Sequence, residues 1–126
     1  MLKQLRKLTF GFTLAIFIVA GAGMARAEGQ PVAIKGYVLD SSCAFTKGLK
    51  KPISSECAVA CAKAGSPLVI LTEAGAIYWP ISDAHPAQGQ NDRLLEFAGK
   101  MVSVKGTSYQ RGGSRAIVIA SVEAAK

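Results

Sequence analysis

The first 27 residues of this 126-residue chain differ from the rest and leave only 99 residues to build a fold. Basic residues at positions 3, 6 and 7 precede an uncharged apolar run over residues 8–23, and the segment closes on Ala25, Arg26 and Ala27. A basic start, a short apolar run and a small-x-small ending are typical of a secretory signal peptide. We therefore expect cleavage after Ala27, export to the periplasm or beyond, and a single mature domain over residues 28–126.

The apolar run is too short to be retained as a membrane anchor. It covers 16 residues, whereas a spanning helix needs roughly 20 apolar residues. No segment after residue 27 has the length and apolarity of a membrane span. We expect the mature protein to have no membrane-spanning segment.

The composition of the remaining 99 residues excludes several classes of protein. All eight acidic residues but only eleven of the fifteen basic ones follow residue 27, so the net charge falls from +7 to +3. Such a small excess of positive charge on an exported protein argues against nucleic acid as a partner. A chain of this length makes one domain and is too short for a doubly wound sheet or an eight-stranded α/β barrel.

Short segments of β character dominate this domain. Alternating or continuous apolar residues bounded by turn residues predict five strands, over residues 32–39, 68–72, 76–80, 101–108 and 116–122. A helix is expected over residues 54–64, because Ser54 can cap its start and Gly65 suits the position after its end. One or two further helical turns are expected over residues 93–98.

These elements predict a mainly β fold, a small five-stranded OB-like barrel with a short cysteine-bearing helix inserted after the first strand. The order of strands and helices lacks the β-α-β alternation of a parallel sheet. Closing the sheet removes its unpaired edges, and an OB-like barrel achieves this with few strands. An open α+β sheet is the alternative.

Three cysteines, Cys43, Cys57 and Cys61, are the only candidates for chemistry in the sequence, and they lie within 19 residues of one another. Cys57 and Cys61 are four residues apart, so both point to one face of the predicted helix. Cys43 is expected at the end of the first strand, before a loop over residues 44–53. The strand end and the helix face could bring the three sulfur atoms together.

Three functions for these thiols remain open from the residues alone. In an exported protein two of them can form a structural disulfide, with one thiol left over. A loop of 15–19 residues closed by Cys43 and either partner would stabilise the fold by about 3 kcal/mol.

A metal site is the second possibility, because thiolates suit Zn(II) and Cu(I). Tetrahedral zinc would need a fourth ligand, and the only histidine is His85. Thiol redox chemistry is the third, since Cys57 near a helix N-terminus would favour its thiolate. No phosphate-binding loop, nucleophile elbow or catalytic triad pattern is present, so we expect no enzymatic activity.

The motifs around the cysteines carry a family resemblance. The chain reads Gly-Tyr-Val-Leu-Asp-Ser-Ser-Cys over residues 36–43 and Glu-Cys-Ala-Val-Ala-Cys-Ala-Lys-Ala-Gly-Ser-Pro over residues 56–67. With the segments 68–78 and 97–106, this pattern resembles an uncharacterised group of small exported bacterial proteins. The resemblance implies an OB-like barrel and a grouping of the three cysteines, and it implies no activity.

The chain departs from this group at one position. Similar sequences often carry a histidine three residues before the first cysteine of the pair, where this chain has Ser54. If that histidine is a metal ligand in the group, only His85 could replace it here. We therefore expect an exported domain whose cysteine cluster binds a metal ion or forms a thiol or disulfide site. The alternatives are a disulfide-stapled module that binds an envelope protein and a small thiol oxidoreductase.

Overall fold

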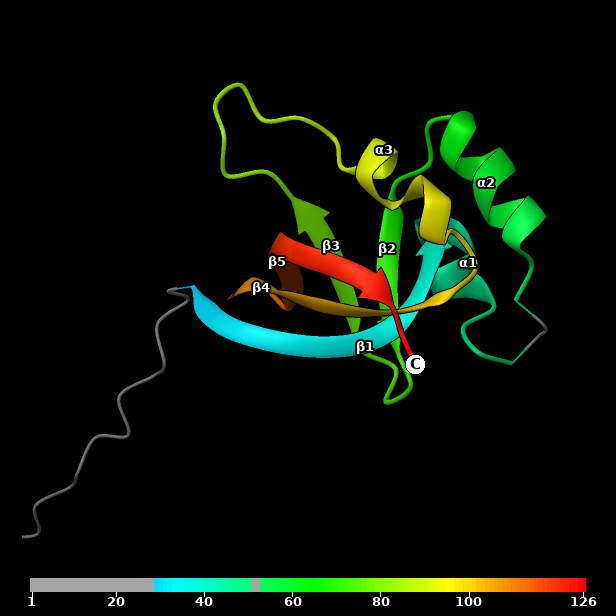
Figure 1. Cartoon of the computed structure of the whole chain (residues 1–126), viewed down its shortest axis with the longest axis horizontal. Helices are drawn as coiled ribbons and strands as arrows, with labels where there is room; N and C mark the ends of the chain where they lie inside the picture. The colour runs from blue at the N-terminus through cyan, green and yellow to red at the C-terminus, as the bar shows by residue number, and fades with distance from the viewer. Residues whose placement is uncertain (1–28, 51–52) are drawn as a thin grey trace, which may run out of the picture.

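The computed structural model describes residues 29–50 and 53–126, so the predicted signal peptide lies outside the described residues. Five strands and four short helical segments follow one another in the order β1, α1, α2, β2, β3, α3, η1, β4, β5 (Figure 1). Their bounds are β1 Gln30–Asp40, α1 Ser41–Thr46, α2 Ser55–Lys63, β2 Leu68–Thr72, β3 Ile77–Ile81, α3 Asn91–Leu94, the 3-10 helix η1 Leu95–Phe97, β4 Met101–Arg111 and β5 Ser114–Ala124.

The five strands form a closed barrel in the order β1-β2-β3-β5-β4, which confirms the predicted fold class. All neighbouring strands are antiparallel except β3 and β5, which pair in parallel. Closure leaves no long unpaired edge between neighbouring strands. It excludes the open α+β sheet that the sequence also allowed.

Strand β1 is long enough to take part in two successive pairings. It pairs with β4 from Gln30 to Tyr37 and with β2 from Gly36 to Asp40. At Gly36, where the two pairings overlap, a Cβ atom would lie 2.7 Å from the backbone oxygen of Leu71. A residue without a side chain is therefore required where the strand bends from one partner to the other.

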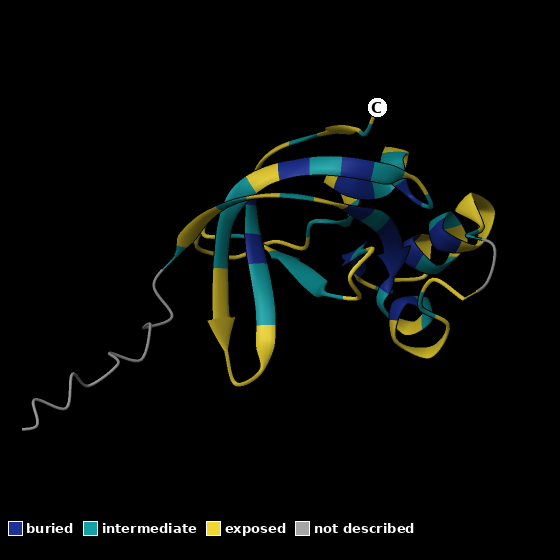
Figure 2. Ribbon diagram, turned by 90° about the horizontal axis from the view of Figure 1, so that it is seen from below, coloured by how far each residue is buried: buried dark blue, intermediate teal, exposed yellow. Residues whose placement is uncertain are grey.

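The apolar residues form two cores, one inside the barrel and one outside it. The barrel core is made of aliphatic side chains from the strands together with residues of α2 and α3: Val38, Ala62, Leu68, Ile70, Leu94, Val102, Val104, Ile117 and Ile119. The outer core lies beneath α1 and contains Leu39, Ala44, Val69 and Leu71. Strand β2 is apolar from Leu68 to Leu71 because its alternate side chains enter different cores. Figure 2 marks these buried positions on the ribbon.

The helices lie at one end of the barrel, away from the tip of the hairpin that joins β4 to β5 (Figure 1). Leu94 of α3 is fully buried in the barrel core, and Ala62 of α2 joins it. The hairpin turns at Gly112 and Gly113, both with positive φ, as a two-residue turn between antiparallel strands requires. None of the helices in the described residues is long and apolar enough to cross a membrane.

The structure corrects the prediction for residues 41–46. The sequence placed Cys43 at the end of the first strand, followed by a loop, whereas Cys43 lies inside helix α1. The prediction of helix α2 is confirmed, with Ser54 as its N-cap and Gly65 at a φ of 103° just after its end. The last two strands extend beyond their predicted limits, since β4 and β5 remain paired up to Arg111 and Ser114.

Candidate thiol site

Helix α1 begins because Asp40, the last residue of β1, caps it. The backbone of Asp40 is still extended, and its Oδ2 accepts a hydrogen bond of 3.2 Å from the backbone N–H of Cys43. Ser66 Oγ donates a second, longer hydrogen bond of 3.5 Å to the same oxygen. Capping by a short acidic side chain turns the chain from strand to helix within one residue. It fixes Cys43 beside the carboxylate.

Helix α2 positions the other two cysteines. Ser54 Oγ accepts a hydrogen bond of 3.2 Å from the backbone N–H of Cys57, so Cys57 occupies the third position of the helix. The buried residues of α2 are the small Ala58 and Ala62, which let the helix lie close to the barrel. Cys57 is exposed and Cys61 is half-buried. A spacing of four residues places the two thiols on one side of the helix.

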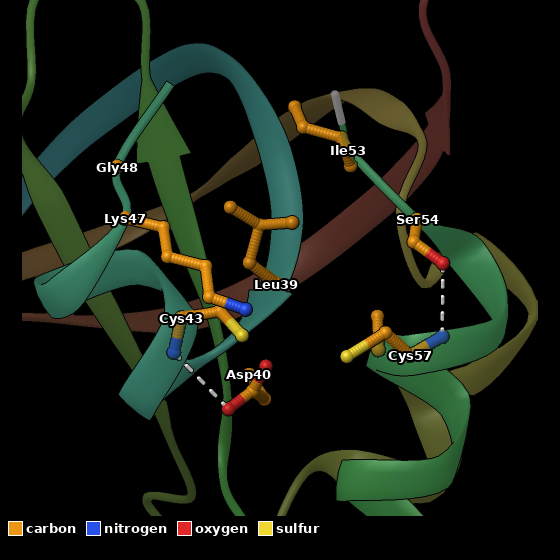
Figure 3. A pocket seen from close by; sticks show the side chains of 9 residues that line it. Leu39, Asp40, Cys43, Lys47, Gly48, Ile53, Ser54 and Cys57 are labelled. Carbon is orange, nitrogen blue, oxygen red and sulfur yellow. Dashed lines mark hydrogen bonds between the residues drawn. The ribbon is translucent and has the colours of Figure 1, made fainter. Parts of the chain in front are cut away.

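The helices α1 and α2 enclose a small cavity of about 60 Å³ above the outer core. Its walls come from the end of β1, from α1 and the residues after it, and from the start of α2: Leu39, Asp40, Cys43, Lys47, Gly48, Ile53, Ser54, Cys57 and Ala58. In Figure 3 the sulfur atoms of Cys43 and Cys57 point toward each other across this space, and the ammonium group of Lys47 lies beside Cys43.

The carboxylate of Asp40 dominates the electrostatics of the cavity. Its interaction with the Cys43 thiol, followed by partial burial, raises the pKa of Cys43 to about 11. Partial burial, then the Asp40 charge and then Cys57 raise the pKa of Cys61. Lys47 acts on both thiols in the opposite direction, and its effect is the smaller one. Both thiols are consequently neutral at physiological pH.

Asp40 itself is almost completely buried, with 1% of its surface exposed. Its Oδ1 atom has no hydrogen-bond partner, although the Cys43 thiol interacts with the same carboxylate group. Nearly all buried polar atoms in proteins have such a partner, since burying a charged atom without one is costly. This unsatisfied oxygen marks the cavity as a place where an additional positive or hydrogen-bonding group would be favourable.

The structure places Cys43 and Cys57 in the cavity wall and Cys61 next to Cys57 but outside that wall, and it leaves His85 away from the cavity. His85 is exposed in the polar loop between β3 and α3, and it is absent from the cavity wall. All three cysteines are free thiols. Across residues 29–50 and 53–126, no three Cys, His, Asp or Glu side chains converge closely enough to hold a metal ion as they stand.

Two further groups of the cavity were not assigned to the site from the sequence. Asp40 was visible as an acidic residue near the cysteines, but its burial and its contact with Cys43 were not. The spacing of Asp40 and Cys43 is the available signal, because a capping side chain binds the N–H two or three residues ahead of it. Lys47 belonged to the predicted loop, and only the turn after α1 brings it to the cavity wall.

Comparisons of this chain with protein-family models, with curated proteins and with solved structures give no match.

Proposed function

We propose that this protein is a small exported, non-enzymatic β-barrel domain that binds one thiophilic metal ion, Zn(II) or Cu(I), through Cys43, Cys57 and Cys61. The observation that carries this proposal is the gathering of three thiols from two helices around one buried carboxylate. Thiolates are the preferred protein ligands of Cu(I) and are common ligands of Zn(II). A cavity of about 60 Å³ between Cys43 and Cys57 also has room for an ion.

The charges of the site support a cation as the occupant. Ionising the thiols beside Asp40 would place several negative charges within one small space, and their repulsion contributes to the raised pKa values of Cys43 and Cys61. The positive charge of a bound metal ion offsets that repulsion, and each thiol that ligates the ion gives up its proton to solvent. Ligation requires the cysteine side chains to rotate into the cavity, since they do not converge as they stand.

The same charges argue against thiol redox catalysis. Reactive cysteines lie in positively charged surroundings that lower the thiol pKa. Cys43 lies beside a carboxylate instead, and its pKa is raised to about 11. A thiol of this kind is a slow nucleophile at neutral pH but becomes a good ligand when a metal ion displaces its proton.

Counting thiols and metal together tests this proposal. The protein is isolated without reductant or chelator, its thiols are alkylated before and after chelation and counted by mass spectrometry, and its metals are measured. We expect one equivalent of Zn or Cu per chain and three thiols that become fully reactive only after chelation. Replacing any of the three cysteines by Ser should weaken binding, whereas His85→Ala serves as the matched control and should not. Three reactive thiols, with no uptake of either metal on titration, would exclude metal binding.

A disulfide between Cys43 and Cys57 is the second candidate. The thiols of these two residues face each other across the cavity (Figure 3), and an exported protein meets oxidising conditions. Such a bond would staple α1 to α2 and make the protein a structural or protein-binding module of the cell envelope. The experiment above separates the two functions, because a disulfide leaves one free thiol, Cys61, and no bound metal.

We also propose that the protein is exported after removal of residues 1–27. The support is the sequence pattern of a basic start, an apolar run and a small-x-small ending. Cell fractionation and N-terminal sequencing test it, with a mature protein in the periplasm that begins at Glu28 as the expected result. A chain that retains Met1 and stays with the cytoplasmic fraction would contradict it.

A further inference from the structure

The negative charge of the Asp40 carboxylate is not needed for capping helix α1. Asn or Ser would cap α1 as well as Asp, and neither would bring a charge into the interior. Asp40 nevertheless has 1% of its surface exposed, and it is the single buried polar or charged residue among those the structure describes. Capping uses Oδ2, while Oδ1 has no partner. The fold therefore holds one carboxylate oxygen in place without using it.

That oxygen is directed toward the thiols. Figure 3 shows the second carboxylate oxygen of Asp40 pointing into the space between the sulfur atoms of Cys43 and Cys57. Cys61 lies within electrostatic reach of the same carboxylate. The polar groups around Asp40 come from three segments: Cys43 and Lys47 from α1 and the turn after it, Cys57 and Cys61 from α2, and Ser66 from the segment before β2. The neighbouring strand β2 presents the apolar Leu68 opposite Asp40.

We propose that Asp40 is the fourth ligand of the metal site. Once the cysteine side chains rotate toward it, since no three of these groups converge as they stand, Asp40 forms with Cys43, Cys57 and Cys61 a three-sulfur, one-oxygen site for a divalent cation of the zinc class. This inference rests on the proposed metal-binding function and decides between its two metals. It also assigns to Asp40 the place that the sequence offered only to His85.

The chemistry of the four groups favours Zn(II) over Cu(I). Zinc is held tetrahedrally by four protein ligands in structural sites, and it accepts Cys sulfur at about 2.3 Å together with carboxylate oxygen at about 2.0–2.2 Å. Carboxylate oxygen is a hard donor and suits harder cations, whereas Cu(I) selects soft thiolate ligands. Three cysteine ligands are therefore sufficient to bind Cu(I), whereas a buried carboxylate among them adds affinity for Zn(II).

The surroundings of Asp40 already resemble those of a held ligand. The Cys43 N–H and the Ser66 hydroxyl both donate to Oδ2 and fix the orientation of the carboxylate. Hydrogen bonds of this kind orient ligands in metal sites and raise the affinity for the ion. Binding of one divalent ion exchanges three thiol protons for the metal, and these protons leave to solvent.

The test compares two metals in one substitution. Zn(II) and Cu(I) affinities of the full chain are measured by competition with chromophoric chelators, for the unmodified protein, for Asp40→Asn and for Asp92→Asn. Asn keeps the cap and the size of the side chain but removes the charge. Asp92 is exposed in the first turn of α3 and serves as the matched control. We expect Asp40→Asn to weaken Zn(II) binding at least tenfold and to change Cu(I) binding less than twofold, with Asp92→Asn unchanged for both.

Each outcome has a distinct meaning. Equal weakening of Zn(II) and Cu(I) would show that the charge of Asp40 attracts any cation without selecting between the two metals as a ligand. Unchanged Zn(II) binding would show that it is no ligand. Both results overturn this inference while the proposed function stands. Failure of the unmodified protein to bind either metal overturns both. Circular dichroism checks the fold, and if Asp40→Asn does not fold, Asp40→Ser, which also caps, takes its place with the same expected result.

Discussion

The inside of the barrel and the outer core beneath α1 are both built from aliphatic side chains, but different groups lie at their boundaries. The barrel core is bounded by paired strands and by helix residues such as Leu94 and Ala62, all of them apolar. The outer core is bounded on its far side by the thiol cavity, where Leu39 is followed directly by the buried Asp40. Apolar side chains therefore surround the barrel core on all sides, whereas the outer core borders the carboxylate of Asp40, one oxygen of which has no hydrogen-bond partner.

This difference suggests separate roles for the two regions: the barrel core stabilises the fold, and the cavity between α1 and α2 is the candidate functional site. Closed, well-packed aliphatic cores tolerate few changes of volume, so the barrel core is suited to holding the strands in place. The cavity between α1 and α2 is held by two cap hydrogen bonds, from Cys43 to Asp40 and from Cys57 to Ser54. The proposed ligation by the three cysteines would require side chains there to rotate while the barrel stays in place.

Truncation inside the barrel should have the largest effect on stability. Ile70 is fully buried in the barrel core, and Ile70→Ala should lower the free energy of unfolding by about 2–5 kcal/mol through lost burial and a residual cavity. Urea denaturation measures it, with Ile81→Ala on the adjacent strand as the control, because 38% of the Ile81 surface is exposed. Similar losses for both variants would mean that the barrel core does not dominate stability.

A clash between β4 and β5 should rank second. At Gly106, beside the irregularity in the β4–β5 register, a Cβ atom would lie 2.1 Å from the backbone oxygen of Val118. The backbone cannot yield as a side chain can, so Gly106→Ala should cost about 1–3 kcal/mol. The matched control is Gly89→Ala, where nothing lies within 4 Å of the new atom. Thermal unfolding of the two variants compares them, and equal midpoints would contradict the expected clash.

The barrel was largely predictable from the sequence, because its strands carry their own patterns. The alternation over residues 32–39 and the apolar run over residues 68–72 depend only on which faces are buried, and both segments are strands. The hairpin joining β4 to β5 turns at Gly112 and Gly113, and a pair of glycines between two apolar segments is a local signal of such a turn. Local residue patterns and tertiary structure agree in these segments, as they do in most foldable sequences.

The thiol site was predictable only in part. The grouping of Cys57 and Cys61 follows from helical spacing, but helix α1 is six residues long and rich in Ser and Thr, which favour turns as much as helices. Its existence depends on the cap from Asp40 and on packing of Ala44 into the outer core. Burial of Asp40 is a tertiary property that no local pattern encodes, so the sequence points only to His85 as a candidate fourth ligand.

The third prediction concerns the reactivity of Cys43. With its pKa raised to about 11 from an ordinary 9.0, the thiolate fraction at pH 8 falls about a hundredfold, and the higher nucleophilicity of the more basic thiolate recovers part of the loss. Alkylation of Cys43 by iodoacetamide in metal-free buffer should therefore be roughly tenfold slower than that of a free thiol. Peptide mass spectrometry measures the rate, and Asp40→Asn should increase it. A rate equal to that of a free cysteine would contradict the contact between Cys43 and Asp40.

The same shift predicts how stability depends on alkaline pH. The folded protein holds the Cys43 proton more tightly than the unfolded chain does, so stability from this group is complete below pH 9 and is lost as the pH rises toward 11. Urea midpoints measured across this range should fall for the unmodified protein more than for Asp40→Asn. An equal decline in both proteins would assign the loss to other groups.

The smallest expected effect is the loss of the cap on α2, and it tests directly whether the two regions are separate. Ser54→Ala removes the acceptor of the Cys57 N–H, which should cost about 1 kcal/mol, whereas Ser54→Asn retains a cap and should cost little. If α2 opens independently of the barrel, amide exchange in Ser55–Lys63 should accelerate about fivefold, the factor that corresponds to 1 kcal/mol, while the amides of Val102 and Val104 keep their rates. Equal acceleration at both places would mean that α2 opens only when the barrel unfolds. The thiol site could then not rearrange around a metal ion without the whole fold, and the contrast between a fixed barrel and an adjustable site would fail.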